Sequence, residues 1–146
     1  MAGHSTRRQR RHKGQVSVPA TGDWSNKIEL TGLGQSGLLS RLVLRRLGGL
    51  APSTVDVMIF YGAGSTYDSV TDFSLVPDED RAYDETGIAV PAASPTAAAA
   101  DRNLLSLYGG IVYDVRSPGD RVWVAVKDAG GVALDMVVSV EARDTL

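Results

Sequence analysis

The stretch Arg121–Ala142 (RVWVAVKDAGGVALDMVVSVEA) carries the pattern that decides the fold of this chain. Apolar residues occupy every second position on both sides of Gly130-Gly131: Val122, Val124 and Val126 before it, and Val132, Leu134, Met136, Val138 and Val140 after it. A period of two is typical of a half-buried β-strand, and adjacent glycines permit the backbone angles of a tight turn. We therefore predict two strands that form a hairpin closed by the glycine pair.

Four further segments predict short strands separated by turns. Thr54–Tyr61 (TVDVMIFY) is rich in β-branched and aromatic residues, and Trp24–Leu30 (WSNKIEL) alternates apolar with polar ones. Leu104–Val115 predicts a strand bent or bulged at its two glycines. Gly37–Leu47 (GLLSRLVLRRL) fits either a strand or a short helix, and we favour the strand. Together they predict an all-β fold, an antiparallel β-sandwich or jelly roll with an extended N-terminal arm.

The length of 146 residues and the composition, 43% hydrophobic and 22% charged, are those of one globular domain. Residues 1–14 are polar and basic, so we predict an extended arm that precedes a single β-sandwich domain over residues 15–146. A long insertion near residues 77–103 combines an acidic stretch with an Ala/Pro run. Insertions of this length are often sites of interaction.

The residue types that carry most enzyme chemistry are scarce. The chain has no cysteine, and its two histidines, His4 and His12, both lie near the N-terminus. Thiolate nucleophiles and cysteine-ligated metals are therefore excluded, and Ser36, Ser40 and Ser94 have no histidine in the body of the chain to activate them. No apolar run approaches the length of a membrane span. We expect a protein that is not an enzyme and does not enter a membrane.

Charge is distributed unevenly along the sequence. The net charge is −2, from 15 basic and 17 acidic residues, but five basic residues precede the first acidic one, Asp23: Arg7, Arg8, Arg10, Arg11 and Lys13. The rest of the chain has ten basic and 17 acidic residues, a net charge of −7. Because an acidic body repels nucleic acid, we predict that the basic arm anchors the chain to an acidic protein neighbour rather than to nucleic acid.

Gly32–Gly37 (GLGQSG) matches the G-x-G-x-x-G pattern of dinucleotide-binding loops, with Asp56 downstream. The strand predicted before it carries Lys27 and Glu29, whereas the central parallel strand of such a fold is apolar because it is buried on both faces. No later β-α alternation follows. We therefore interpret this stretch as a glycine-rich turn and expect no cofactor.

Two other clusters have both a chemical and a structural interpretation. The acidic residues near position 80 fail the spacing of an EF-hand calcium loop, because Ala82, Tyr83 and Ala89 replace a ligand, a glycine and a bidentate Glu. We expect no metal site and interpret this acidic cluster as a solvated or intersubunit loop; it comprises Asp78, Glu79, Asp80, Asp84 and Glu85. Trp24 and Trp123 could stack on a sugar, but aromatic residues within strands are more often core or interface anchors.

Apolar residues that fit the strand pattern poorly predict a surface for self-association. They lie in the stretches 38–47 and 88–100, and those we assign to this surface are Leu38, Leu42, Leu44, Ile88 and Val90. We predict a homo-oligomer, with a trimer favoured.

A polar N-terminal arm, a cysteine-free body of short strands and a long Ala/Pro insertion together resemble a known group of proteins. The strands concerned are KIELTG (27–32), TVDVMIFY (54–61) and RVWVAVKDAGGVALDMVVSV (121–140). The pattern is similar to the small jelly-roll decoration (cement) proteins of tailed bacteriophage capsids. The resemblance implies a non-enzymatic virion protein on the capsid surface, often a trimer, whose arm and loops bridge subunits of the major capsid protein. No single residue carries over, because the resemblance has no diagnostic motif.

Two alternatives stay open. A phage tail or baseplate adhesin that binds glycans would use Trp24 or Trp123. A small jelly-roll coat protein, similar to those of very small icosahedral viruses, would turn the basic arm toward the genome.

Overall fold

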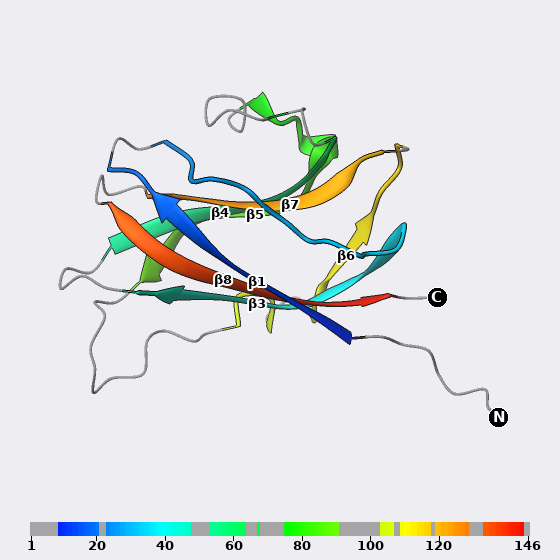
Figure 1. The fold of residues 1–146 in the computed structure, drawn as a ribbon, viewed down its shortest axis with the longest axis horizontal. Helices are drawn as coiled ribbons and strands as arrows, with labels where there is room; N and C mark the ends of the chain where they lie inside the picture. Colours follow the sequence, from blue (N-terminus) through cyan, green and yellow to red (C-terminus); the bar gives the residue numbers. More distant parts are fainter. Residues whose placement is uncertain are drawn as a thin grey trace.

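Two four-stranded antiparallel sheets, packed face to face, make up most of the described part of the chain (Figure 1). The computed structural model describes residues 9–20, 23–47, 53–63, 67, 75–90, 103–106, 109–117, 119–128 and 133–144. The strands are β1 (Gln9–Val18), β2 (Ile28–Glu29), β3 (Ser36–Arg46), β4 (Ser53–Gly62), β5 (Arg81–Val90), β6 (Ile111–Asp114), β7 (Arg121–Asp128) and β8 (Leu134–Asp144). A 3-10 turn, η2 (Asp78–Asp80), precedes β5, and the described residues contain no α-helix. The predicted antiparallel all-β sandwich is confirmed.

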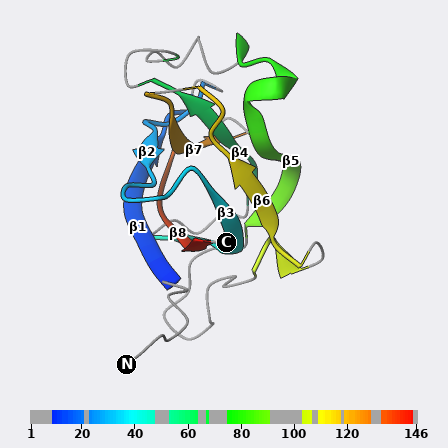
Figure 2. The same cartoon turned by 90° about the vertical axis from the view of Figure 1, so that its right-hand side faces the viewer.

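The order of the strands is that of a jelly roll. One sheet has the order β1-β8-β3-β6 and the other the order β2-β7-β4-β5. Four antiparallel pairs are thus nested one inside the next along the chain: β1 with β8, β2 with β7, β3 with β6, and β4 with β5. Rolling up such a nested ribbon produces the two Greek keys of this fold. β1 and β2 lie along one side of the sandwich, and β5 and β6 lie along the other (Figure 2).

The two sheets differ in what covers their outer faces. Inward-facing residues of both sheets, such as Leu42 and Val124, form the main core between them. β4 and β7 are also buried on their other face by a second cluster, which contains Met58, Phe60, Val76, Trp123 and Ala125. Among the described residues no such cluster covers the sheet of β1, β8, β3 and β6. The outer face of that sheet is therefore open to solvent.

The predicted hairpin between residues 121–127 and 132–142 is wrong. Both strands form, but β7 pairs with β2 and β4, whereas β8 crosses to the other sheet and pairs with β1 and β3. Alternating apolar residues identify the side of a strand that faces the core, and either sheet satisfies that requirement equally. The partner of each strand is set by residues far away in the sequence.

The N-terminal arm is shorter than predicted. Residues 9–18 form β1, which pairs residue by residue with β8, from Gln9 opposite Arg143 to Val18 opposite Leu134. Residues 1–8 lie outside the described residues. The predicted boundary at residue 14 is wrong because basic residues suggested a solvated segment, whereas in β1 Arg11 and Lys13 point to the open face, where charge is compatible with a strand.

The predicted insertion near residues 77–103 contains a strand. Residues 81–90 form β5, an edge strand that pairs with β4. The acidic residues suggested a loop, but Tyr83 is buried and Asp84 exposed, as a strand with one wet face requires. Two register shifts in the pairing with β4 break the simple alternation and hide the strand in the sequence. Residues 91–102, which hold the Ala/Pro run, lie outside the described residues.

Four of the five residues predicted for self-association belong to the core. They are at most 5% exposed and pack between the sheets: Leu42, Leu44, Ile88 and Val90. For these four the prediction is wrong, because a buried side chain cannot meet a second copy. β3 is a strand, as predicted, but a register shift between Leu39 and Arg41 changes the face to which its side chains point. Leu38 is half-buried, opposite the exposed Val112 of β6.

Two of the predicted strands are shorter than expected. Within residues 24–30 only β2 forms, together with an isolated bridge between Trp24 and Lys127. Within residues 104–115 only the four-residue β6 forms. Gly109 and Gly110 have φ angles of 66° and 108°, so the chain turns at these glycines and the strand begins after them.

Candidate functional site

The open outer face of β1, β8 and β3 carries four exposed cationic side chains. Arg11 and Lys13 come from β1, and Arg41 and Arg45 come from β3. β8 lies between these two strands, so one pair of cations lies on each side of it. Because successive side chains of a strand point to opposite faces, the buried leucines between Arg41 and Arg45 turn both arginines to the open side.

The register of the strands aligns these side chains in rows. Arg11 and Arg41 both lie opposite Glu141 of β8, Lys13 lies opposite Ser139, and one row further Arg45 lies opposite Val137. The hollow between the two lines of cations has a volume of about 270 Å³. We call it the basic groove; it is lined by Arg11, Lys13, Arg41, Val43, Arg45, Val137, Ser139 and Glu141.

The dimensions of the basic groove follow from sheet geometry. Two strand spacings separate β1 from β3, a width of ~10 Å, and the four-residue step from Val137 to Glu141 gives a length of ~14 Å. Val43 is only 8% exposed although it belongs to neither core cluster. We attribute this burial to the aliphatic stems of the long cationic side chains beside it. Such stems lie along the sheet and leave the charged ends at the rim.

The basic groove has an excess of positive charge. Arg11 Nη2 donates to Glu141 Oε1 at 2.8 Å, and Glu141 is the one acidic residue in the lining. In the described part of the chain, no carboxylate lies within ion-pair distance of Lys13, Arg41 or Arg45. Four cations and one carboxylate give the groove a formal charge of +3. An exposed ion pair such as Arg11–Glu141 contributes less than ~1 kcal/mol to stability, so the arrangement is of interest for binding rather than for folding.

The structure separates the basic residues that the sequence groups together. Arg11 and Lys13 line the basic groove, whereas Arg10 lies on the opposite face of β1, against Gly32. A Cβ atom at Gly32 would collide with Arg10 Nη1, and Gly32 has a φ of 72°, which favours glycine. The two arm residues outside the described residues are Arg7 and Arg8.

Sequence reasoning missed Arg41 and Arg45. Both lie in the segment that fits either a strand or a helix, and the sequence alone does not show that β8 and the basic residues of β1 lie beside it. The available signal was the run Arg41–Arg45 (RLVLR), in which leucines flank a central valine and arginines stand at both ends. Placed in a strand beside β8, this run joins the basic residues of β1 on one face.

His12 lies on the inner side of β1, opposite Val140 of β8. Burial lowers the pKa of His12 below its usual value of 6.5, and the positive charge of Arg10 lowers the pKa further. The imidazole is therefore neutral at physiological pH and adds no charge to the basic groove.

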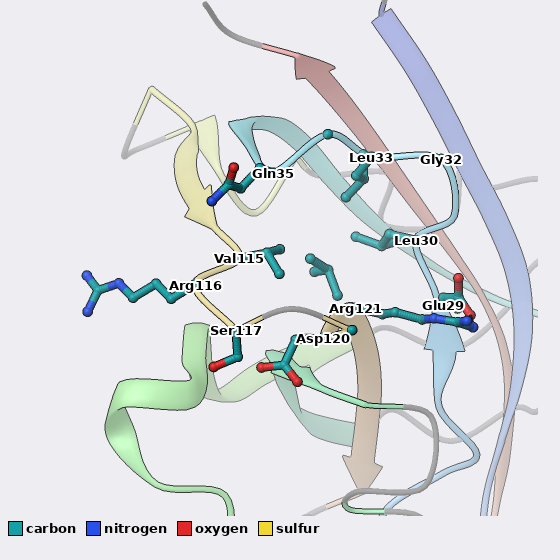
Figure 3. A pocket seen from close by; sticks show the side chains of 13 residues that line it. Glu29, Leu30, Gly32, Leu33, Gln35, Val115, Arg116, Ser117, Asp120 and Arg121 are labelled. Atoms are coloured by element: carbon teal, nitrogen blue, oxygen red, sulfur yellow. Dashed lines mark hydrogen bonds and ion pairs between the residues drawn. The ribbon is translucent and has the colours of Figure 1, made fainter.

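A second hollow, with a volume of about 630 Å³, opens at one end of the sandwich (Figure 3). We call it the end pocket; it lies between residues 29–35, which lead from β2 into β3, and residues 115–122, which lead from β6 into β7. Leu30, Leu33 and Val115 point toward its centre (Figure 3). Its polar rim includes Gln35, Arg116, Ser117, Asp120 and Arg121.

The end pocket is held in shape by contacts on two sides. Val115 N donates to Gln35 O at 2.7 Å, and Leu30 N donates to Val122 O at 2.9 Å. Arg121 Nη1 also donates to Glu29 Oε1 at 2.9 Å, and Figure 3 shows these two side chains next to each other. These contacts within the chain tie the two segments together.

The glycine-rich stretch at residues 32–37 borders the end pocket and leads into β3. A dinucleotide-binding loop leads instead into a helix, whose N-terminus binds the phosphates. Asp56 accepts a hydrogen bond from Gly87 N at 3.0 Å, which joins β4 to β5. This arrangement corresponds to a turn between two strands.

Trp123 is not available as a stacking platform for sugars. Its side chain is buried in the second cluster, and its Nε1 donates to Gly62 O at 2.9 Å. Lys27 Nζ lies 4.2 Å from the centroid of the ring. Trp24 is half-buried, with Lys127 Nζ 5.8 Å from its ring centroid. Both indoles serve as anchors within the fold.

The acidic cluster near residue 80 is engaged in local contacts. Tyr67 Oη donates to Asp80 Oδ2 at 2.9 Å, and Arg81 Nη1 donates to Asp84 Oδ2 at 2.9 Å. The part of the chain that the structure describes contains no group of three or more acidic or histidine side chains placed to hold a metal ion. Of the serines considered as nucleophiles, Ser40 Oγ donates to the backbone O of Glu141 at 3.3 Å.

Across the described segments, no helix is long and apolar enough to cross a membrane. Compared with known protein families, characterised proteins and solved structures, the chain has no match.

Proposed function

We propose that this chain is a non-enzymatic structural protein of a virion, a decoration (cement) protein that attaches to the outer surface of a phage capsid. In this proposal it binds the major capsid protein, adds contact area to the shell and acts as a homo-oligomer, with a trimer favoured. The observation that carries the proposal is the basic groove, a cationic and solvent-exposed sheet face on a chain whose net charge is −2.

The fold supports this proposal by analogy. Jelly rolls with eight strands occur in viral capsid proteins, in lectins and in cupins. One fold hosts many functions, so the surface and its chemistry have to identify the function. The cationic face is the surface feature that favours attachment to a neighbour.

Attachment to a shell requires contact area and complementary charge rather than reactive groups. Several copies of the groove in one oligomer would convert a weak single contact into durable attachment, because each further contact forms within the same complex. Charge complementarity would also speed the encounter of an abundant decoration protein with its shell.

The test is the position of the chain in particles. Virions purified on a gradient from cultures that express the chain should contain it, and electron cryo-microscopy should place it outside the shell. Particles that lack the chain should rupture at a lower temperature than complete ones. Washed virions that contain no chain, or chain found only inside the shell, would contradict the proposal.

The end pocket favours a second candidate, a glycan-binding adhesin. Its volume of about 630 Å³ lies within the range of small-ligand sites, and it combines an apolar floor with a polar rim. Binding on a glycan array that is lost in the variant Leu33→Trp, which fills the pocket, would support this candidate. Absence of binding by the wild-type chain would exclude it.

A further inference from the structure

We infer that the basic groove is the docking site for an extended, carboxylate-rich segment of a neighbouring protein, which lies along β8. The inference rests on the proposed function only for the identity of that neighbour, the capsid subunit. The surface itself is defined by the register of three strands.

The basic groove already holds a carboxylate at one end. Glu141 lies between Arg11 and Arg41 in the strand register and accepts a hydrogen bond from Arg11 at 2.8 Å. Further along β8, the floor residues Ser139 and Val137 are uncharged, although Lys13 and Arg45 flank them. A carboxylate of a partner placed between these two floor residues would have Lys13 on the β1 side and Arg45, one row further, on the β3 side. Charge-assisted hydrogen bonds of this kind are stronger than neutral ones.

The spacing of the rows suits an extended chain. Glu141, Ser139 and Val137 are separated by two residues each, so successive rows are ~6.8 Å apart along β8. Side chains that point to one face of an extended segment repeat at the same interval. A segment with an acidic residue at every second position would therefore place successive carboxylates over successive rows.

The boundaries of the basic groove favour an acidic peptide over nucleic acid. Beyond Val137 at one end of the groove β8 carries the exposed Asp135, and beyond Glu141 at the other end it carries the exposed Arg143. A nucleic acid strand that extends past Val137 would run over the carboxylate of Asp135, whereas a short acidic segment ends before it. Outside the first 14 residues the chain has a net charge of −7, which repels a long polyanion further.

Fluorescence anisotropy on the full chain tests the inference with a probe that needs no virion. The probe is a labelled peptide in which Glu and Ser alternate. An oligothymidine of equal negative charge is tested beside it and represents nucleic acid. The groove variant is Arg41→Glu/Arg45→Glu. The matched control is Arg116→Glu/Arg121→Glu, which changes the net charge equally at exposed positions of the end pocket.

We expect the peptide to bind the wild-type chain at low ionic strength and to bind more weakly at ~0.15 M salt, because rim charges are screened. The groove variant should lose affinity about tenfold or more, and the control at most about twofold. Equal losses in both variants, or no binding by a folded wild-type chain, would overturn the inference. If the oligothymidine binds more tightly than the peptide, and does so through Arg41 and Arg45, the inference is overturned in favour of a coat protein whose basic surface faces the genome.

The outcome for the docking site can be separated from that for the proposed function. Variant chains that stay on purified particles as well as the wild type would overturn the docking site and leave the decoration function standing. Peptide binding through the groove by a chain that is absent from virions would support the docking site and contradict the decoration function. A wild-type chain that self-associates until Arg41 and Arg45 are replaced would assign the groove to a second copy and overturn the inference.

Discussion

Arg11 Nη2 donates to Glu141 Oε1 at 2.8 Å across β1 and β8, and this contact joins residues that are 130 positions apart. It shows that the basic N-terminal region is built into the sheet rather than attached to it. The same pair forms one end of the basic groove, so the integrity of β1 and the binding surface are linked.

Truncation separates the arm from the strand. Removal of residues 1–8 should leave the thermal unfolding temperature nearly unchanged, because β1 begins at Gln9. Removal of residues 1–14 should lower it strongly and promote aggregation, because it takes away six residues of β1 and exposes the edge of β8. Calorimetry and light scattering of both truncated chains check this. Equal stability of the two would contradict the pairing of β1 with β8.

Replacement of the carboxylate in the basic groove should strengthen binding of acidic probes. Glu141→Gln removes the one acidic residue of the lining and releases Arg11 from its ion pair. We expect the affinity for the Glu-Ser peptide to rise a few-fold and the stability to change by less than ~1 kcal/mol, as for other exposed ion pairs. Anisotropy titration and urea denaturation measure the two effects. An unchanged or lower affinity would show that Glu141 does not compete for the site.

The side chain of Leu42 should contribute to the stability of the core and not to self-association. Leu42→Ala should cost ~2–5 kcal/mol of unfolding free energy, because it leaves a cavity between the sheets. The oligomeric state of the folded fraction should not change. Leu47→Ala, at a position that is 50% exposed, is the control and should stay within ~0.5 kcal/mol of the wild type. Loss of oligomers without loss of stability in Leu42→Ala would restore the interface assignment.

His12 should make stability depend on pH below its ordinary pKa. Burial lowers the pKa of His12 in the folded chain, with Arg10 as a further cause, so the unfolded chain takes up the proton first as pH falls. This contribution is constant above pH 6.5 and is lost as pH falls below 6.5 toward the folded pKa. Urea midpoints at several pH values should therefore fall less steeply for His12→Gln than for the wild type. Parallel curves for the two proteins would show that His12 carries no such effect.

Close packing at the start of β3 should make Gly37 intolerant of a side chain. A Cβ atom there would lie 2.5 Å from Tyr113 Oη and against the backbone O of Arg143. Gly37→Ala should cost ~1–3 kcal/mol through overpacking, while the neighbouring exposed Ser36→Ala should have little effect. Adding Tyr113→Phe to Gly37→Ala should recover part of the loss, because it removes one of the colliding atoms. A neutral Gly37→Ala would disprove the close approach of these strands.

Most of the long strands could be predicted from the sequence, whereas β5 and the effect of the register shift in β3 could not. Residues 54–61 and 121–127 are strands as expected, because both are rich in the β-branched and aromatic residues that favour buried strands. β5 was mistaken for a loop because acidic residues and two register shifts obscure that period. β3 was correctly predicted as a strand. Its register shift places its leucines in the core, whereas the sequence alone had assigned them to an interface.

The amino-acid sequence by itself determined the class of the fold, the acidic body and the scarcity of reactive side chains, because these depend on composition and local periodicity. Tertiary structure alone decided that β8 lies between β1 and β3 and that β7 belongs to the other sheet. Strand pairing is a contact between segments that are distant in the sequence. It is made by backbone hydrogen bonds, which are nearly independent of residue type, so the sequence of one strand does not identify its partner. The basic groove exists only because that pairing places Arg11 and Lys13 on one side of β8 and Arg41 and Arg45 on the other.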